Sequence, residues 1–185
     1  MILRGTPRLI LREWRKTDRD LFREINADPK VMEFFPTSRS HAESDAALER
    51  INDMIRATGF GFYALELRET AEPIGFCGIA PANLEGIFPL GTMEIGWRLA
   101  TRFWGHGYVT EAAKSMLAMA FDEKKKPEIV SFAVRDNQRS VSVMKRIGLI
   151  RDPSRDFDHP RVPETHPQLK PHVTYALTLE RWLGK

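Results

Sequence analysis

The most informative segment of this chain reads Glu94-Ile-Gly-Trp-Arg-Leu-Ala-Thr-Arg-Phe-Trp-Gly-His-Gly-Tyr-Val-Thr-Glu111. Its first part alternates apolar Met93, Ile95, Trp97 and Leu99 with other residues. A period of two residues is typical of a β-strand, because successive side chains point to opposite faces of a sheet. The segment therefore predicts a strand that ends near Leu99.

A turn with two glycines follows the strand and leads into a long helix. The helix is predicted from one apolar face with helical spacing, made of Val109, Ala112, Ala113, Met116, Leu117, Ala120 and Phe121. Gly105 and Gly107 leave backbone N–H groups uncovered, and the first turn of a helix attracts anions. Glu94 places a carboxylate on the preceding strand. The segment thus predicts an anion cradle beside a potential base, as in an enzyme that uses a phosphorylated cofactor.

Other interpretations of the glycine turn remain open at this stage. A Gly-x-Gly turn often joins a strand to a helix without any ligand. A dinucleotide-binding turn is disfavoured, because Gly105-x-Gly107-x-x-Thr110 lacks the third glycine. A P-loop is excluded because no Gly-Lys-Ser/Thr follows. Arg102, three residues before Gly105, favours the ligand-binding interpretation.

Composition narrows the class of protein. With 185 residues, 42% of them hydrophobic, the chain is expected to form one domain, residues 1–185. The net charge is +3, and the run Lys124–Lys126 is placed to complement the dipole at a helix end, so no nucleic-acid partner is expected. Cys77 has no disulfide partner and is expected in the core. Neither a membrane span nor a signal peptide is apparent, so we expect no membrane association and a cytoplasmic location.

The predicted elements alternate along the chain. An edge strand is expected at residues 8–13, a hairpin at 60–68 and 73–80, and further strands at 128–134 and 173–179. A Thr17/Asp20 box predicts a helix that ends at Asp28-Pro29, and a Ser40/Glu43 box predicts one that ends at Gly59. The inner face of the second helix is predicted as Ala47, Ile51, Met54 and Ile55. A last helix is expected from Asn137 to Ile147. This order predicts a mixed α/β sheet.

The order of elements, with Arg102-x-x-Gly105-x-Gly107 between a strand and its helix and Asn137-x-x-Ser140 after the next strand, resembles the GNAT superfamily of acetyl-CoA-dependent N-acetyltransferases. The resemblance extends from Arg8 to about Leu179. The segments at residues 7–12 and 94–99 look most like the branch that acetylates the N-termini of ribosomal proteins. The resemblance implies a mixed, mostly antiparallel sheet with splayed central strands flanked by helices, and a homodimer.

The same resemblance implies where acetyl-CoA is bound. The backbone from Arg102 to Tyr108 would cradle the pyrophosphate, and the backbone of Trp97 to Leu99 would pair with pantetheine. Asn137 and Ser140 would lie beside the pantetheine arm and its thiol. The implied cofactor-binding residues are Trp97, Arg98, Leu99, Arg102, Phe103, Trp104, Gly105, His106, Gly107, Tyr108, Val109, Thr110, Asn137 and Ser140. No metal is expected.

The reaction requires a group that removes a proton from the acceptor amine, because the amine is mostly protonated at neutral pH. Glu94 is the candidate base; alternatively, it is an exposed strand carboxylate or the partner of Arg98. A backbone N–H such as that of Trp97 would polarise the thioester carbonyl. The helix after Asn137 lacks the tyrosine that many family members use as an acid, so Ser140, or else Ser142, would protonate the leaving thiolate. Direct transfer in a ternary complex needs no acyl-enzyme.

Two further regions bear on the acceptor. The segment at residues 152–171 is rich in proline, and its histidines match no compact zinc pattern, so we expect a lid over the acceptor cleft or a packed surface loop. Trp14 and residues 34–36 would form the opposite wall or belong to the core. The expected acceptor is a primary amine, either a protein N-terminus or a small molecule. The alternative function is a non-catalytic acyl-CoA-binding module.

Overall fold

The computed structural model describes residues 2–184, and the chain divides into two compact units. The first unit comprises Met1–Ile79 and Gly96–Met116, and the second comprises Ala80–Ile95 and Leu117–Lys185. The chain passes between them within the fourth strand, within the fifth strand and near the end of the third α-helix.

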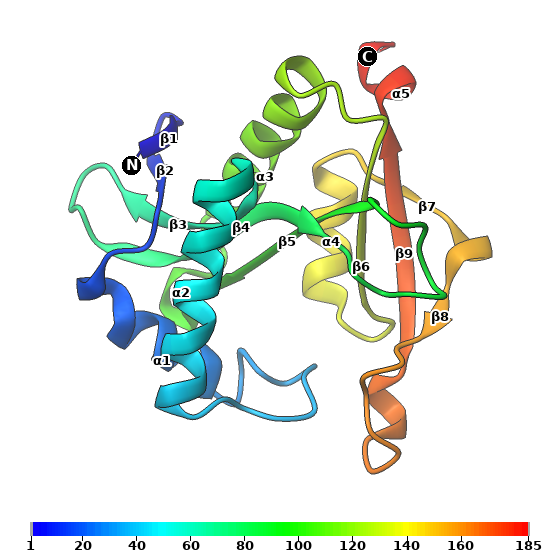
Figure 1. Cartoon of the computed structure of the whole chain (residues 1–185), viewed down its shortest axis with the longest axis horizontal. Helices are drawn as coiled ribbons and strands as arrows, with labels where there is room; N and C mark the ends of the chain where they lie inside the picture. Colours follow the sequence, from blue (N-terminus) through cyan, green and yellow to red (C-terminus); the bar gives the residue numbers. More distant parts are fainter. Residues whose placement is uncertain (1, 185) are drawn as a thin grey trace. The chain divides into compact units, whose positions relative to one another are not determined.

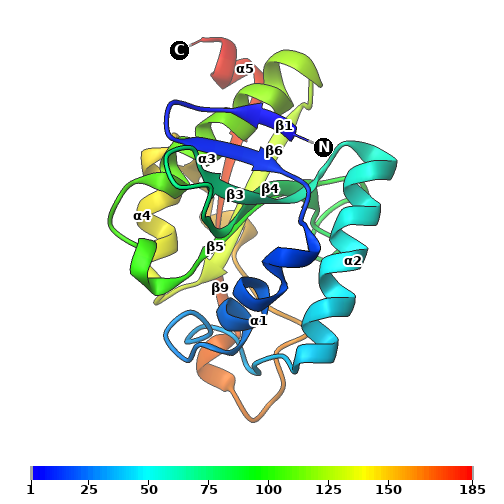
Figure 2. The same ribbon diagram turned by 90° about the vertical axis from the view of Figure 1, so that its left-hand side faces the viewer.

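The first unit contains a sheet whose strands follow the order β1-β2-β3-β4 (Figures 1 and 2). The strands are β1 (Ile2–Gly5), β2 (Leu9–Arg12), β3 (Gly61–Leu67) and β4 (Pro73–Pro81). All three pairings are antiparallel. The strand predicted at residues 8–13 is confirmed as β2, but its predicted edge position is wrong, since β2 pairs with β1 on one side and β3 on the other. The apolar residues of β1, Ile2 and Leu3, are adjacent and do not alternate with polar residues, so the sequence pattern did not predict this strand.

Three helices complete the first unit: α1 (Arg19–Ala27), α2 (His41–Thr58) and α3 (Tyr108–Ala118). The Ser40/Glu43 box is confirmed, because Ser40 Oγ accepts from Glu43 N at 3.3 Å and Glu43 Oε2 accepts from Ser40 N at 2.8 Å. Gly59 ends α2 in the left-handed conformation, as predicted. The Thr17/Asp20 box is wrong, since Asp18 instead accepts from the Arg15 N–H in a 3-10 turn, Lys16–Asp18, that precedes α1.

The core of the first unit lies where α1 and α2 pack together, and its buried members include Trp14, Phe22 and Phe76. The Trp14 and Phe22 rings meet edge to face, with centroids 4.8 Å apart. The inner face predicted for α2 is confirmed at Ala47 and Ile55, whereas Ile51 and Met54 are half-buried. Its buried residues are Ser44, Ala47, Leu48, Asn52 and Ile55. Polar Asn52 belongs to that face because its amide exchanges two hydrogen bonds with the backbone of Trp14, at 2.9 and 3.0 Å.

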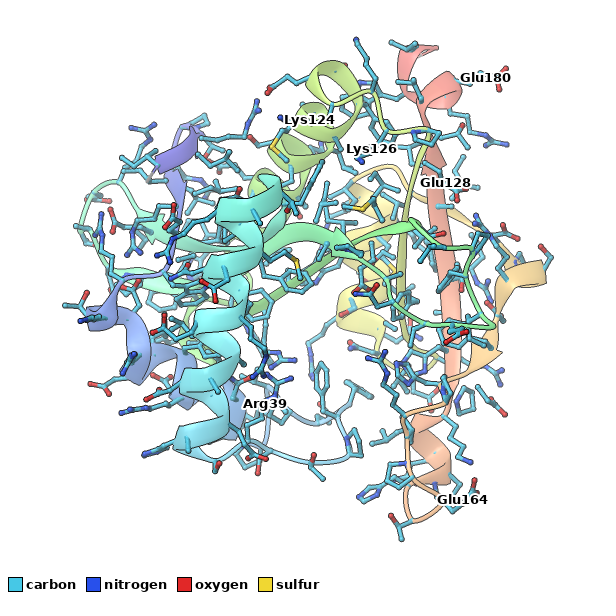
Figure 3. The ribbon with its side chains drawn as sticks, in the orientation of Figure 1. Arg39, Lys124, Lys126, Glu128, Glu164 and Glu180 are labelled. Atoms are coloured by element: carbon cyan, nitrogen blue, oxygen red, sulfur yellow. The ribbon has the colours of Figure 1, made fainter. Side chains whose placement is uncertain are left out.

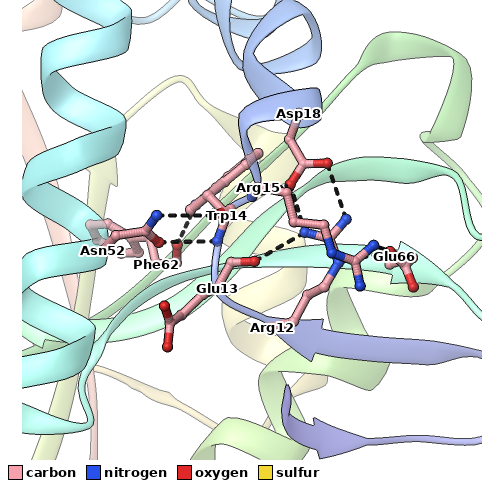
Figure 4. Close-up of polar contacts among 8 residues, drawn as sticks. All are labelled: Arg12, Glu13, Trp14, Arg15, Asp18, Asn52, Phe62 and Glu66. Atoms are coloured by element: carbon pink, nitrogen blue, oxygen red, sulfur yellow. Dashed lines mark hydrogen bonds and ion pairs between the residues drawn. The ribbon is translucent and has the colours of Figure 1, made fainter. Parts of the chain in front are cut away.

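A buried ion network joins β2, β3 and the start of α1 in the same unit (Figure 4). Arg12 is 2% exposed and donates to Asp18 at 2.6 and 3.1 Å and to Glu66 Oε2 at 2.7 Å. Arg15, which is half exposed, donates to the same Glu66 oxygen at 2.7 Å. The two guanidinium groups together balance the charges of the two buried carboxylates.

The second unit is built on the strand order β5-β6-β9-β7, with β8 also paired to β9. The strands are β5 (Met93–Leu99, of which 93–95 belong to this unit), β6 (Glu128–Val134), β7 (Ile150–Arg151), β8 (Phe157–Asp158) and β9 (Pro171–Thr178). Two helices accompany them, α4 (Gln138–Arg146) and α5 (Leu179–Leu183). The β6–β9 ladder is antiparallel over the whole of β6, whereas β5 and β6 pair in parallel only at Met93↔Ile129 and Glu94↔Val130.

A wide helical turn of π type, Met119–Glu123, follows the α3 helix. Phe121 of this turn stacks on Trp182 of α5 at 5.4 Å, and the Trp182 indole donates to Asp122 Oδ1 at 2.6 Å. Lys124 and Lys126 lie directly after this turn (Figure 3), where their backbone N–H groups bond to Met119 O and Ala120 O. The lysine run is therefore at the helix end, as expected.

These features confirm the mixed α/β fold with a mostly antiparallel sheet flanked by helices, since among the pairings described here only β5–β6 is parallel. The brevity of the β5–β6 pairing agrees with the expected splaying of the central strands. Cys77 is fully buried, as predicted. None of the helices within residues 2–184 combines the length and apolar character that crossing a bilayer requires.

Candidate active site

The glycine turn of the first unit is open on its outer side. Gly105 and Gly107 have φ values of +81° and +78°, a conformation that only glycine adopts without strain. A Cβ atom added at Gly105 would meet no atom within 4 Å. The α3 ladder begins with the Glu111 N–H bonded to Gly107 O at 3.1 Å, so the N–H groups before Glu111 precede the helical ladder. The turn offers room and donors for an anion.

Arg8, the residue before β2, contacts this turn. Its guanidinium donates to Glu111 Oε2 at 2.7 Å and to the backbone oxygen of His106 at 3.0 Å, and it lies 4.7 Å over the Tyr108 ring. Glu111 also accepts from Thr6 Oγ1 at 2.6 Å. Burial acts to raise the pKa of Glu111, but the hydrogen bonds from Thr6 and Arg8 outweigh it and keep that pKa below its usual value. The N-terminal segment thus fixes the turn and the first turn of α3.

The Arg102 side chain is turned toward α1. It pairs with Glu24 and lies 4.8 Å over the ring of Phe103. The Arg102 side chain is about half exposed and can be reached by a ligand bound at the turn. The carboxylate of Glu24 already contacts one edge of its guanidinium. The backbone, rather than this side chain, forms the open part of the turn.

The backbone of β5 is the predicted pantetheine track. The Leu99 carbonyl accepts from the Trp104 indole at 2.9 Å, and the following Ala100 N–H donates to Ile74 O at 3.1 Å. A Cβ at Gly75 would lie 2.2 Å from Arg98 O, so β4 needs glycine there to approach β5. Trp97 and Arg98 are half-buried and Leu99 is buried. One carbonyl of the track is therefore already engaged by the protein.

Asn137 and Ser140 lie at the start of α4 in the second unit. The Asn137 side chain caps the helix, because its Oδ1 accepts from Ser140 N at 3.1 Å. The spacing Asn-x-x-Ser therefore has a structural reason besides any contact with a ligand. Ser140 is half-buried, and its hydroxyl has no hydrogen-bond partner within residues 2–184. It is available as a proton donor, whereas Ser142 is exposed.

Glu94, on the part of β5 that belongs to the second unit, has a carboxyl group whose pKa is strongly raised. The β5–β6 register places it beside Val130, whose face also carries Phe132 and an apolar cluster with Phe88. Burial raises the pKa of Glu94 to about 8, and the positive charge of Arg161 opposes the shift. Glu94 is half-buried, so a carboxyl that titrates near neutral pH stays within reach of a ligand. Such a group suits general base catalysis.

The segment 152–171 packs onto the second unit. Its strand β8 pairs with β9, and the ring of Phe157 stacks on His172 at 5.4 Å. His159 lies 4.8 Å from His172, and burial lowers the pKa of His159 to about 4, so both rings are neutral at pH 7. No group of three or more metal-ligating side chains occurs within residues 2–184. Of the two alternatives from the sequence, a lid or a packed surface loop, the contacts of this segment with β9 agree with the packed loop.

The Arg98 side chain belongs to the first unit. It does not form the ion pair with Glu94 that was one alternative from the sequence. It donates to Asn26 Oδ1 at 2.6 Å and lies 4.2 Å over the ring of Phe35. Burial, with the repulsion of Arg39, lowers the pKa of Arg98 to about 10. Trp14, which was expected in the core or in a substrate wall, is 4% exposed and belongs to the core, whereas Phe35 is 44% exposed.

Sequence reasoning missed the partners of both charged residues on β5. Arg161 and Phe132, near Glu94, come from segments distant in sequence, as do Asn26 and Arg39 near Arg98. The proline-rich segment that contains Arg161 was noticed, but its composition carried no information on where it packs. Only the alternation of Val130 and Phe132 on β6 signalled the apolar face beside Glu94.

Comparison with known proteins adds relatives over nearly the whole chain. A family model described as an acetyltransferase (GNAT) domain matches residues 8–150. The uncharacterized protein YkkB of Bacillus subtilis is 30% identical over 135 residues, which cover 71% of this chain and 77% of YkkB. The crystal structure of an acetyltransferase from Agrobacterium tumefaciens is 28% identical, with a TM-score of 0.75 over 96% of this chain and 94% of that one. The ribosomal L7/L12 α-N-protein acetyltransferase RimL, in complex with coenzyme A, shares the fold with a TM-score of 0.74 at 15% identity, over 98% of this chain and 99% of that one.

Proposed function

The chain belongs to the GNAT acetyltransferase family, and from that membership we propose that it transfers the acetyl group of acetyl-CoA to a primary amine. Membership makes the protein an acyltransferase of a family that uses acetyl-CoA. The proposal further treats residues 1–185 as one N-acetyltransferase domain. The observation that carries it is the open turn at Gly105 and Gly107, where a Cβ at Gly105 would enter empty space at a helix N-terminus.

The turn fits a pyrophosphate. We propose that the backbone from Arg102 to Thr110 forms its site, with the N–H donors coming from residues 105–110, because the N–H groups of Phe103 and Trp104 are bonded to Ala100 O and Thr101 O. We further propose that the backbone of Trp97 to Leu99 holds pantetheine and that Asn137 and Ser140 border the thiol. The acetyl-CoA, when bound, supplies an activated acetyl group as its thioester. Backbone donors suit this task because they are fixed before the ligand arrives and carry partial positive charge at the helix end.

Glu94 is proposed as the base. Its carboxylate would take the proton of the acceptor ammonium, directly or through one water, and free the nitrogen lone pair for attack. A pKa of about 8 places the carboxyl closer to the pKa of an amine, near 10, than an ordinary glutamate. The Trp97 N–H would stabilise the charge that develops on the carbonyl oxygen. The Ser140 hydroxyl is proposed to protonate the leaving thiolate.

The acceptor is proposed to be a protein N-terminus or a small-molecule amine. RimL acts on the N-terminus of a ribosomal protein, and its fold likeness brings that class to consideration here. We also propose a homodimer and no nucleic-acid, membrane or metal requirement. A non-catalytic acyl-CoA-binding module is the second candidate function, favoured by the lack of a tyrosine in the helix after Asn137.

The proposal is tested by incubating the full chain with acetyl-CoA and a panel of amines, while free CoA thiol and acetylated amine are measured. The panel contains peptides with free N-termini, amino acids, polyamines and aminoglycosides. Turnover with at least one class, in equal amounts of thiol and acetylated amine, is expected. Binding of acetyl-CoA without thiol release from any amine would favour the binding module.

The role of the turn predicts a specific effect of Gly105→Ala. The added methyl group strains the backbone at φ +81° and enters the proposed pyrophosphate site, so the KM for acetyl-CoA should rise roughly tenfold or more. Gly59→Ala is the matched control, because Gly59 has φ +71° and equally open space but lies at the end of α2. Steady-state kinetics and urea unfolding separate the effects. Equal KM values in the two variants would remove the turn from cofactor binding.

Direct transfer predicts that the thiol of Cys77 takes no part. Cys77 is fully buried, and burial raises its pKa, so the thiolate nucleophile is scarce at neutral pH. The native protein should react with Ellman's reagent at least ~100-fold more slowly than the urea-unfolded protein, in line with the scarcity of the thiolate. Cys77→Ala should retain most activity. A trapped acetyl-thioester on Cys77 would contradict the direct route.

A further inference from the structure

Arg98 is a half-buried cation that forms no ion pair with a carboxylate of residues 2–184. Its guanidinium lies between the rings of Phe35, at 4.2 Å, and Phe76, at 5.6 Å, and one nitrogen donates to Asn26 at 2.6 Å. Within residues 2–184 no carboxylate pairs with it. Removing a charge from water, even in part, is costly unless an opposite charge compensates it. The cost is sustained where a ligand supplies the missing charge.

A second arginine is held next to the first by the same residue. The backbone oxygen of Asn26 accepts from the Arg39 N–H at 3.0 Å, while its side-chain oxygen accepts from Arg98. Asn26 is itself 1% exposed and fixed by a bond from its amide to Phe22 O at 2.8 Å. Arg39 lies where the chain enters α2 (Figure 3) and forms no ion pair within residues 2–184. Its charge is close enough to lower the pKa of Arg98.

The acidic side chains near these arginines are engaged elsewhere. Glu43 accepts from the Ser40 backbone and hydroxyl in the α2 cap. Asp28 accepts from the backbone of Lys30 at 2.8 Å and from Thr101. The charge of Arg39 contributes to the lowered pKa of Glu43, after the hydrogen bonds from Ser40. Neither carboxylate forms an ion pair with Arg98 or Arg39, so both guanidinium groups keep N–H donors for a ligand.

We propose that Arg98 and Arg39 bind a carboxylate of the acceptor, so that the substrate is an amine that also bears a carboxylate, such as an amino acid or an acidic peptide. This inference rests on the proposed acetyl transfer, because it takes the bound carboxylate to belong to the amine that accepts the acetyl group. The planar guanidinium of Arg98 has N–H groups left for a two-point contact with a carboxylate, and Arg39 adds a second charge from the surface. Phe35, 44% exposed, covers one face of Arg98 and would lie against the apolar part of the acceptor.

Binding of reaction products tests the carboxylate site without turnover. N-acetylphenylalanine and N-acetylphenethylamine differ in the carboxylate alone, and isothermal titration gives the Kd of each. We expect the carboxylate to tighten binding at least ~10-fold, as a charge-assisted bidentate contact can. Arg98→Met should abolish the difference, and Arg39→Met should reduce it about threefold. Arg50→Met, an exposed arginine on α2, is the control and should keep it.

Kinetics with phenylalanine and phenethylamine distinguish this inference from the proposed function. If neither amine nor any other is acetylated but N-acetylphenylalanine binds in an Arg98-dependent way, acetyl transfer is wrong and the carboxylate site stands. If amines are acetylated equally with and without a carboxylate, and Arg98→Met changes neither, the site is wrong and acetyl transfer stands. If Arg98→Met does not fold, Arg98→Lys and Arg39→Met are measured instead; Arg98→Lys keeps the charge but loses the two-point contact of the guanidinium. If both variants keep the wild-type ratio of the two Kd values, the inference is wrong.

Discussion

Replacing Glu94 by Gln is expected to lower kcat/KM for the acceptor by roughly 10²- to 10⁴-fold, the range of a lost general base. The variant keeps the shape of the side chain but accepts no proton. In the wild-type protein kcat/KM should rise with pH through about 8 as the Glu94 carboxyl ionises. That inflection should be absent from the variant, whose profile should follow the ionisation of the amine alone.

Stability supplies an independent readout for the same substitution. The folded pKa of Glu94, about 8, lies above its ordinary value of 4.5, so the folded protein binds more protons than the unfolded chain between these values. Wild-type stability relative to Glu94→Gln should therefore fall as pH rises from about 4.5 to 8. Glu85→Gln, at an exposed position of the same unit, should change neither quantity. Full activity in Glu94→Gln across this range would remove Glu94 from catalysis.

Replacing Arg12 by Met is expected to lower the free energy of unfolding by about 3–5 kcal/mol, the usual cost of leaving buried carboxylates without their cation. Asp18 and Glu66 are 2% and 5% exposed and both depend on the Arg12 guanidinium (Figure 4). Urea unfolding at pH 7, followed by tryptophan fluorescence, measures the loss, since Trp14 packs close by.

Two companion variants show whether the charge or the shape of Arg12 matters. Arg15→Met removes a half-exposed arginine from the same Glu66 oxygen and should cost about 1 kcal/mol or less. The triple variant Arg12→Met, Asp18→Leu, Glu66→Leu removes the three buried charges of this network and should recover most of the stability. A loss in Arg15→Met as large as that in Arg12→Met would show that exposure does not decide the strength of these pairs.

Local rules predicted the elements that depend on short segments. The Ser40/Glu43 box, Gly59 at the end of α2 and the bounds of β6 all follow from residues within a few positions of one another, and the structure confirms them. The open glycine turn was likewise predictable, because Gly105 and Gly107 require left-handed backbone and the apolar face of α3 begins directly after them.

The features that the sequence did not predict are mostly short strands or depend on contacts between distant segments. The strand β1 has only the pairing with β2 to define it, and β7 and β8 are two residues long, so no periodicity reveals them. The inner face of α2 was predicted only in part, because Asn52 is also buried there by its bonds to Trp14, 38 residues earlier. The pKa of Glu94 and the unpaired charge of Arg98 arise from packing, which the order of residues on β5 does not disclose.

The bonds of Arg8 to Glu111 and His106 have a consequence for the order of folding. They join residues 103 and 98 positions apart, and closing a loop of that length costs about 4 kcal/mol of chain entropy. Neither partner of Glu111 is available locally, so the turn gains its final geometry only after β2 has joined the sheet. During synthesis the first eight residues leave the ribosome about a hundred residues before Glu111. The ligand-ready turn is thus a late product of folding, acquired after the strands that support it.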